Sequence, residues 1–451
     1  MPRSSLVPWA IAAMLCFGVA SPADDPAAAN ARRGPAFLDK ATIYQIWLRS
    51  FTPEGTIQAA ARRLPHIAGL GVSIVYLSPV NVQSHAGGFS NPYRINDYYR
   101  IDPEYGTEAD LKEFLESAHK LGLKVLMDIV FYHTGPDSVM MQTPSFYMHQ
   151  DGQIVLGQWH LPRPDFENPR LRDYLIGALL HWARDVGVDG FRCDVSSGVP
   201  LDFWEQARAQ LDHVNPDLIM LAESENPLEM LHAFDVSYAF SYQTALRQIF
   251  AGGEPATRLR TQWEHNRDGF PQGTRMLRAS DNHDQKRAIV EFGERGARAA
   301  SVVNFTMDGI PFLYNGQEIG DTVATDHQSH YPLRWELDRP SGQAGSGLAA
   351  GQKQWVAFYK RLFDLRGQET TLTSGTVVWI TNSLPESVIS FERNSAGESM
   401  LIIVNASNRK CAGTVQAAPG YRTLFAGQGD KLESGRFQLG AFGYVVSKRS
   451  N

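Results

Sequence analysis

Three carboxylic acids, Asp194, Glu223 and Asp284, each follow or end a short apolar run of the sequence. Cleavage of a glycosidic bond needs two carboxyl groups in different environments, one protonated to give a proton to the leaving oxygen and one ionised to attack. Asp194 and Glu223 suit these two roles. Arg192, two residues before Asp194 on the same face of a strand, can keep Asp194 ionised by its positive charge. Asp284 could bind sugar hydroxyls and stabilise a cationic transition state.

Two histidines, His133 and His283, occupy similar positions and are candidates to donate hydrogen bonds to hydroxyls of the same sugar. Taken singly, these residues have simpler explanations. His133 could be a core histidine with satisfied hydrogen bonds, and Asp194 could be the N-cap of the predicted helix at 201–211. Glu223 could be a strand-end charge and Asp284 half of a surface ion pair. Their joint placement at the ends of apolar runs favours a catalytic site.

The elements that would position these residues are short β-rich runs alternating with helical patterns, which is typical of βα units around a parallel sheet. The predicted strands are 43–51, 73–79, 124–130, 190–195, 218–223, 236–240, 275–280 and 310–314. Eight such runs predict a closed (β/α)₈ TIM barrel, which we place at residues 36–366. In this fold the active site lies at the C-terminal ends of the strands, so the polar residues would converge on one mouth.

Two further regions depart from the βα pattern. Residues 133–169, after the third strand, are rich in Met, Pro, Gly and Gln and lack clear periodicity, which predicts an inserted lobe over the barrel mouth. Within it, Trp159 and Phe166 could be sugar platforms or could pack the lobe. Residues 367–451 show short alternating strands separated by turns, which predicts a C-terminal antiparallel β-sandwich domain.

Four short segments resemble, in the same order, the four sequence regions of the α-amylase family of glycoside hydrolases (glycoside hydrolase family 13). They are DIVFYH at 128–133, GFRCD at 190–194, MLAE at 220–223 and DNHD at 281–284. The resemblance extends from about Phe37 to the C-terminus. It implies a retaining double displacement with Asp194 as nucleophile, Glu223 as general acid and then base, and Asp284 as the carboxylate that stabilises the transition state.

The resemblance also implies substrate contacts from Tyr93, His133, Arg192 and His283 in the subsite where cleavage occurs. Asp128 would orient the arginine and not act as a catalyst. The expected substrates are malto-oligosaccharides, starch-derived dextrins or related α-glucans, cleaved at α-glucosidic bonds and first of all at α-1,4 bonds. An α-glucosyltransferase or isomerase of the same family is an alternative. A non-catalytic carbohydrate- or protein-binding relative is a second alternative, although such a relative would be expected to lose one of the three carboxylates.

The residues at the family's common calcium site differ here. Tyr132 stands before His133 where calcium-dependent members usually show Asn, and Ser197 and Gly198 stand where they show Lys-His. The Asn and His normally contribute calcium ligands, and a phenol or a glycine replaces them poorly. We therefore expect no cofactor, no metal ligand among the predicted site residues and no calcium at this place, while another calcium site is left open.

The composition excludes some partners. The 451 residues carry a formal net charge of −6, and the basic residues are scattered, which argues against nucleic acid. Cys193 and Cys411 are too far apart in unrelated contexts to indicate a disulfide framework. We expect no transmembrane segment in the mature chain, and the oligomeric state is left open.

The N-terminus predicts export. Arg3, an apolar stretch and small residues before about position 23 form the layout of a secretory signal peptide at residues 1–23, followed by a disordered segment at 24–35. A membrane anchor would need about 18 apolar residues, and Pro8 and Pro22 bound a shorter run. A lipoprotein is less favoured because Leu15, not a small residue, precedes Cys16. The protein is expected to be secreted or periplasmic.

Overall fold

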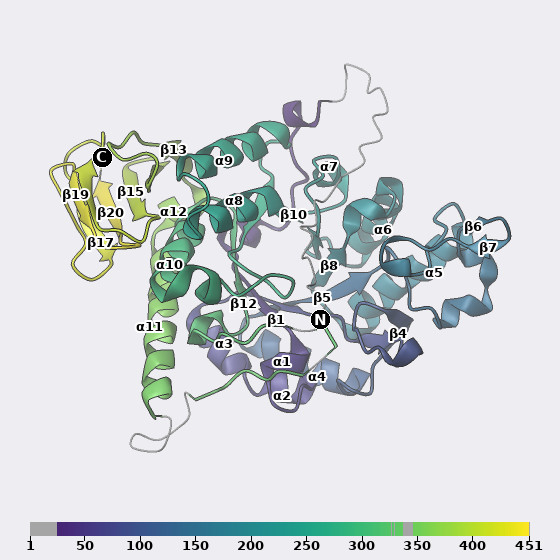
Figure 1. Cartoon of the computed structure of the whole chain (residues 1–451). Coiled ribbons are helices and arrows are strands. Elements are labelled where there is room, and N and C mark those ends of the chain that lie inside the picture. The colour runs from purple at the N-terminus through teal and green to yellow at the C-terminus, as the bar shows by residue number, and fades with distance from the viewer. Residues whose placement is uncertain (1–24, 326, 329, 337–345, 451) are drawn as a thin grey trace, which may run out of the picture.

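Eight parallel strands close into a barrel in the centre of the molecule (Figure 1). The computed structural model describes residues 25–325, 327–328, 330–336 and 346–450, so the predicted signal peptide and Cys16 lie outside the described residues. The barrel strands are β1 (Ile43–Ile46), β2 (Ile74–Leu77), β5 (Lys124–Val130), β8 (Gly190–Asp194), β9 (Ile219–Ala222), β10 (Val236–Ser237), β11 (Arg275–Arg278) and β12 (Ile310–Tyr314). Each predicted run contains one of these strands, and the (β/α)₈ prediction is confirmed.

Nearly all residues of these strands are buried because side chains cover both faces of the sheet, one inside the barrel and one under the helices. The first strand is shorter than the predicted run 43–51. The side-chain oxygen of Asn315 accepts a hydrogen bond from the backbone N–H of Trp47 at 2.6 Å, and helix α1 (Leu48–Phe51) begins at the next residue.

Helices surround the barrel, and local sequence explains where they begin. Helix α4 (Glu108–Lys120) starts with a capping box between Thr107 and Asp110 and buries Leu111, Phe114, Leu115 and Ala118. The other α-helices are α2 (Ile57–Ala61), α3 (Leu64–Leu70), α5 (Pro169–Leu180), α6 (Leu201–Val214), α7 (Glu229–His232), α8 (Phe240–Phe250), α9 (Thr257–Gly269), α10 (Ala288–Thr306), α11 (Ser346–Gln368) and α12 (Thr370–Ser374).

The segment between β5 and α5 forms a small lobe that projects from the barrel near β6 and β7 (Figure 1). It contains the short strands β6 (His149–Gln150) and β7 (Gln153–Ile154) and the 3₁₀ turns η4 (Val139–Gln142), η5 (Pro144–Phe146) and η6 (Gln158–His160). A second long connecting segment, between β2 and α4, contains the antiparallel strands β3 (Asn81–Gln83) and β4 (Ile95–Ile101).

The C-terminal domain consists of two antiparallel sheets. One contains β13 (Thr376–Trp379), β14 (Val388–Ser395), β15 (Glu398–Asn405), β20 (Tyr444–Ser450) and β17 (Arg422–Ala426), and the other contains β16 (Cys411–Thr414), β19 (Arg436–Leu439) and β18 (Lys431–Glu433). Side chains of both sheets, among them Leu401, Ile403, Phe437 and Leu439, share one hydrophobic cluster. This packing is that of a β-sandwich, as predicted.

Residues 25–35 correct the expectation of disorder for 24–35. Arg32 pairs with Asp212 at 2.9 Å and with the buried Asp235, and the backbone N–H of Ala31 donates to the carbonyl of Gln272. The Ala/Pro-rich composition suggested a loose segment, but the ion pairs of Arg32 and backbone hydrogen bonds with Gln272 and Met230 hold it in place.

No helix in the described part of the chain is long and apolar enough to cross a membrane. Cys193 is buried, and it and Cys411 are both free thiols in the described structure.

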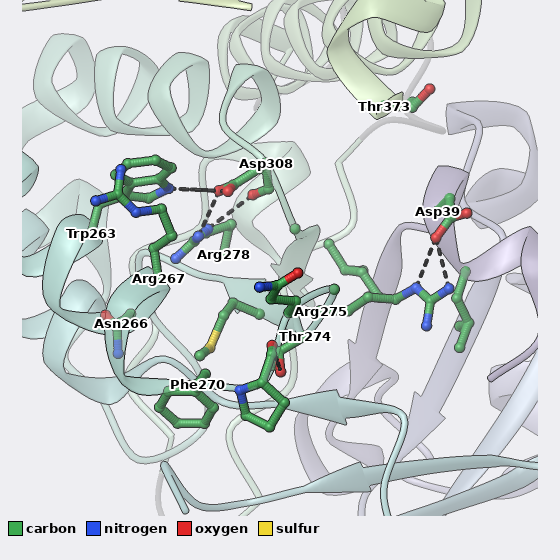
Figure 2. Close-up of a pocket in the computed structure, with 17 residues that line it drawn as sticks. Asp39, Trp263, Asn266, Arg267, Phe270, Thr274, Arg275, Arg278, Asp308 and Thr373 are labelled. Carbon is green, nitrogen blue, oxygen red and sulfur yellow. Dashed lines mark hydrogen bonds and ion pairs between the residues drawn. The ribbon is translucent and has the colours of Figure 1, made fainter. Parts of the chain in front are cut away.

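A cavity of about 370 Å³ lies at the N-terminal end of the barrel, beside the first residues of β11 and β12 (Figure 2). Most of its charged side chains are paired with each other, and Arg267 pairs with the neighbouring Asp268. Arg275 contacts Asp39 at 2.8 Å, and Asp308 accepts hydrogen bonds from Arg278 and from the indole of Trp263. Barrel enzymes carry their catalytic residues at the opposite, C-terminal end of the strands, so the active site is expected there.

Candidate active site

A cavity of about 680 Å³ opens at the C-terminal mouth of the barrel. It is lined by six of the residues predicted from sequence, namely Tyr93, His133, Asp194, Glu223, His283 and Asp284. The other two, Asp128 and Arg192, are fully buried and contact these residues from below. The structure therefore brings all eight predicted residues to one place.

Arg192 organises the carboxylates because strand register places it between them. Asp128 on β5 is the register partner of Arg192 on β8, and Asp194 lies two residues further along β8 on the same face. The Nη1 atom of Arg192 donates to Asp128 Oδ1 at 2.9 Å and to Asp194 Oδ1 at 2.7 Å, and Nη2 contacts Glu223. One guanidinium thus contacts three carboxylates at once.

Glu223 follows directly after β9, and its Oε2 accepts a hydrogen bond from the backbone N–H of Val195 at 2.8 Å. Burial, together with the negative charges of Asp194 and Asp284, raises the pKa of Glu223 well above its ordinary value, although Arg192 acts in the opposite direction. A carboxyl group in this environment holds its proton at pH values where an exposed glutamate is ionised.

Asp284 lies between two imidazoles. Its Oδ2 is 3.1 Å from His283 Nε2, and its Oδ1 is 3.2 Å from His327 Nε2. Burial opposes its ionisation, but the contacts with His283 and His327 hold the pKa of Asp284 well below its usual range. Asp284 and Glu223 are therefore carboxyl groups whose environments move their pKa values in opposite directions.

The rings beside Asp284 form an ordered stack. His283 lies 5.2 Å from the ring of Trp47 and 5.4 Å from that of Tyr93, and both pairs are nearly parallel. The Tyr93 hydroxyl donates to Asp128 Oδ2 at 2.8 Å. Burial lowers the pKa of His283 to about 3, so its ring is neutral around pH 7.

His133 has a free hydrogen-bonding atom beside the cavity. Its Nε2 contacts the backbone carbonyl of Tyr93 at 3.1 Å, whereas its buried Nδ1 has no hydrogen-bond partner in the described structure. A buried polar atom without a partner is costly, and a ligand hydroxyl would satisfy it. Burial also lowers the pKa of His133, which favours its neutral form.

The structure does not support the simpler explanations for Asp194 and Asp284, whereas it supports lobe packing for Phe166. The N-cap position of α6 is Pro200, six residues beyond Asp194. Asp284 contacts histidines of the mouth and forms no described surface ion pair with a neighbouring Lys or Arg. Phe166 is buried and packs on Phe203 at 4.9 Å, so it packs the lobe.

Phe89, Trp159 and His327 are among the further residues that line the cavity and are absent from the predicted site. Trp159 is 54% exposed and has a left-handed backbone, with φ of 64°. The sequence left Trp159 undecided between a platform and lobe packing, and its exposure at the cavity favours the first. His327 comes from the loop after β12, and no motif around it signalled a site.

His283, Asp284 and His327 place ligating atoms within 4.8 Å of one another. This is a geometry that a transition metal could use. In the structure these atoms contact each other, and His283 also contacts Gln45 and Tyr93 through its two nitrogens.

Comparisons with known protein families and structures identify α-amylases as similar proteins. The family profile described as alpha amylase, catalytic domain, matches residues 35–145 and 140–336. Alpha-amylase MalA of Haloarcula japonica is 32% identical over 315 residues, which are 65% of this chain and 47% of that protein. This chain therefore spans about half the length of that relative. Alpha-amylase 2 of Dictyoglomus thermophilum is 25% identical over 435 residues, covering 87% of this chain and 74% of that protein.

Among solved structures, a noncanonic maltogenic alpha-amylase AmyB from Thermotoga neapolitana matches with a TM-score of 0.79 and 26% identity, covering 91% of this chain and 99% of that one. An alpha-amylase from Lactobacillus plantarum matches with a TM-score of 0.77, also at 26% identity.

A closed βα barrel with paired carboxyl groups at its C-terminal mouth is an architecture of glycosidases. The chain belongs to the α-amylase family of glycosidases, because the catalytic-domain profile matches more than half of its length.

Proposed function

We propose that the protein is a retaining glycoside hydrolase that cleaves α-glucosidic bonds, first of all α-1,4 bonds, in malto-oligosaccharides, dextrins or related α-glucans. The observation that carries this proposal is the contact of one guanidinium, that of Arg192, with both Asp194 and Glu223. A retaining mechanism needs its two carboxyl groups only about 5–5.5 Å apart. A shared guanidinium keeps them close.

In the first step, an oxygen of Asp194 attacks the anomeric carbon and the bond to the glycosidic oxygen breaks. Glu223 gives its proton to that oxygen, and the leaving sugar departs as an alcohol. The raised pKa of Glu223 supports its role as the acid. The ionised Asp284, which contacts two histidines, would stabilise positive charge on the sugar ring.

In the second step, the ionised Glu223 takes a proton from water, and the water oxygen attacks the anomeric carbon of the covalent intermediate. The bond to Asp194 breaks, and the product keeps the α configuration. Glu223 is protonated again and Asp194 is ionised again, so the cycle is closed.

Neutral groups would bind the sugar. His133 Nδ1 would contact a sugar hydroxyl, the His283 ring would line the same subsite, and the Tyr93 ring would face the apolar side of the sugar. Trp159, exposed on the lobe, would stack on a neighbouring sugar. The relatives include a cyclomaltodextrinase from a Bacillus species and neopullulanase 2 of Thermoactinomyces vulgaris, so linkage and ring form are open to test.

The deciding experiment incubates the purified protein with maltoheptaose, pullulan, isomaltose and sucrose and follows the anomeric configuration of products by NMR. Rapid release of α-anomeric product supports the proposal. Asp194→Asn and Glu223→Gln serve as controls, because each keeps the side-chain volume and removes the reacting group. Activity comparable to the wild type in a folded Asp194→Asn variant would contradict the assignment of Asp194 as the nucleophile. Longer saccharides among the products would indicate glucosyl transfer to a sugar acceptor.

We also propose that the protein is exported. The Arg3-led apolar stretch supports this, whereas one relative is an intracellular maltogenic amylase of Bacillus subtilis and gives no support. Expression of the full chain in a bacterium with a secretory pathway, followed by N-terminal sequencing of the exported product, tests it. A cytoplasmic product that begins at Met1 would contradict export.

A further inference from the structure

The guanidinium of Arg163 lies between the lobe and the loop that follows Asp194. Its Cζ is 3.8 Å from the ring centroid of Tyr132, which is the distance of a cation–π contact. Its Nη2 donates to the backbone carbonyl of Gly198 at 3.1 Å. Tyr132 follows strand β5, and Gly198 ends the turn η8 (Ser196–Gly198). One lobe side chain therefore contacts both loops beside the catalytic cavity.

Two glycines leave room for this arrangement. A Cβ atom at Gly198 would collide with the Tyr132 ring, and one at Gly157 would lie 2.5 Å from Arg163 Cδ. The aromatic ring, the arginine and the two glycines therefore fit together as a set. A larger residue at either glycine would displace the ring or the guanidinium.

The same place does not fit calcium. Tyr132 and Gly198 stand at positions where the family resemblance implies calcium ligands, and calcium takes six to eight oxygen ligands. Here Tyr132 turns the face of its ring to a fixed positive charge, and the Gly198 carbonyl already accepts a hydrogen bond from that charge. A calcium ion beside Arg163 would be repelled.

We propose that the guanidinium of Arg163 takes the place of the family's calcium ion, fastening the lobe to the loop behind the nucleophile, and is thereby a positioning residue for Glu223. The path between them is short. The N–H of Gly198 donates to the Val195 carbonyl at 2.9 Å, and the N–H of Val195 donates to Glu223 Oε2 at 2.8 Å.

Val195 shows why this turn needs support from outside. It has φ of 42° and ψ of 49°, a left-handed conformation that is unfavourable for a β-branched residue. Arg163 holds the far end of the turn at Gly198. Burial is the main cause of the lowered pKa of His133; the positive charge of Arg163 also lowers it, whereas Asp194 and the hydrogen bond to the Tyr93 carbonyl raise it.

The first test asks whether calcium is needed. The full protein is dialysed against EDTA, with or without later addition of calcium chloride, and proteolysis within residues 133–169 is followed by mass spectrometry. We expect equal protection of the lobe under both conditions. Protection that disappears with EDTA and returns with calcium would overturn the proposal.

The second test asks whether Arg163 does the fastening. Arg163→Met should lower the thermal midpoint and speed cleavage of the lobe, whereas Arg170→Met, an exposed arginine nearby, should change neither. Arg163→Lys keeps the positive charge but loses the planar guanidinium, so its thermal midpoint and its rate of lobe cleavage should lie between those of the wild type and of Arg163→Met. This variant also provides a test if Arg163→Met does not fold. Wild-type protection of the lobe in both Arg163 variants would overturn the proposal.

A matched pair at Tyr132 isolates the cation–π contact. Tyr132→Phe keeps a ring beneath the guanidinium and should protect the lobe as in the wild type. Tyr132→Leu removes the ring and should speed cleavage of the lobe. Equal protection in the two variants would contradict the assigned contact.

The positioning role has its own readout and rests on the proposed hydrolase function. Because cation–π contacts and charge-assisted hydrogen bonds are modest, Arg163→Met should lower kcat about 3- to 10-fold. The Val195 N–H lowers the pKa of Glu223, which also faces Arg192, Asp194 and Asp284. Loosening of the turn should therefore move the alkaline limb of activity to higher pH, and an unmoved limb would contradict positioning. The thermal midpoint and the rate of lobe cleavage can be measured without turnover. A protein without hydrolase activity would therefore contradict the proposed function, while the role of Arg163 in fastening the lobe would still be tested by these two measurements.

Discussion

Arg192 Nη1 lies 2.7 Å from Asp194 Oδ1, two residues along the same strand, while the second terminal nitrogen of the same guanidinium contacts Glu223. The two carboxyl groups with opposite proposed roles thus share one fixed positive charge. Lysine cannot reproduce this arrangement, because it carries a single nitrogen on a flexible stem.

Replacement of Arg192 by lysine should therefore keep the positive charge and remove the simultaneous contacts with the carboxylates. We expect Arg192→Lys to fold and to lose about 10- to 100-fold in kcat/KM, the size expected from lost charge-assisted hydrogen bonds of about 1.5–3 kcal/mol. Arg208→Lys is a control, because Arg208 is also buried but pairs with Asp212 and Asp235 away from the mouth. Wild-type kcat/KM in Arg192→Lys would argue against a shared guanidinium as the organising contact.

The pH profile should report the environment of Glu223. The protonated form of Glu223 is the proposed acid, and burial raises its pKa, so activity on a neutral oligosaccharide should persist well above the ordinary range of a glutamate and fall as Glu223 ionises. The measurement is kcat/KM against pH. An alkaline limb near pH 4.3, the value of an exposed glutamate, would contradict the assignment.

Glu223→Gln should discriminate between leaving groups. A natural maltoside needs a proton on its leaving oxygen and should lose about 10²- to 10⁴-fold in rate. A nitrophenyl α-glycoside has a better leaving group and should lose much less in the first step. The comparison uses initial burst rates for the two substrates, and equal losses would show that Glu223 does not act as the acid.

His327 should matter for binding although no sequence motif marks it. Its contact with Asp284 at 3.2 Å helps to keep that carboxylate ionised and in place. We expect His327→Ala to lower kcat/KM about 10-fold, equivalent to ~1.4 kcal/mol. His330→Ala, in the same loop but paired with Glu104, should leave kcat/KM unchanged. The reverse pattern would exclude His327 from the site.

Arg393 should hold the C-terminal domain on the barrel. It is buried on β14 and donates to the backbone carbonyls of Thr306, Leu372 and Gly375 at 2.7–2.8 Å. Arg393→Met would remove these hydrogen bonds, although the Leu372 carbonyl would keep one from Arg366 at 3.2 Å, so we expect a loss of about 3 kcal/mol in the free energy of unfolding. Thermal unfolding measures it, with the exposed Arg422→Met as a control. Equal midpoints would mean that the domain is held by other contacts.

Much of the architecture follows from local patterns. Most barrel strands were predictable because they lie in short, mainly apolar runs that are followed by a polar residue, and burial on both faces produces that pattern. The convergence of Asp128, Arg192, Asp194 and Glu223 was predictable as well, because parallel strands bring their C-terminal ends to one mouth. The catalytic roles of these residues remain predictions.

Contacts between distant segments were not predictable. His327 reaches Asp284 from an irregular loop, Arg32 anchors an N-terminal segment that looked disordered, and Arg163 meets Tyr132 across the lobe. Each of these contacts depends on the position of a long side chain relative to a distant segment of the chain. No periodicity or spacing in the sequence predicts that position. The sequence by itself determined the fold class and which candidate carboxylates converge at the mouth, since these depend on burial patterns along the chain. Only the tertiary structure decided which further side chains hold and surround them.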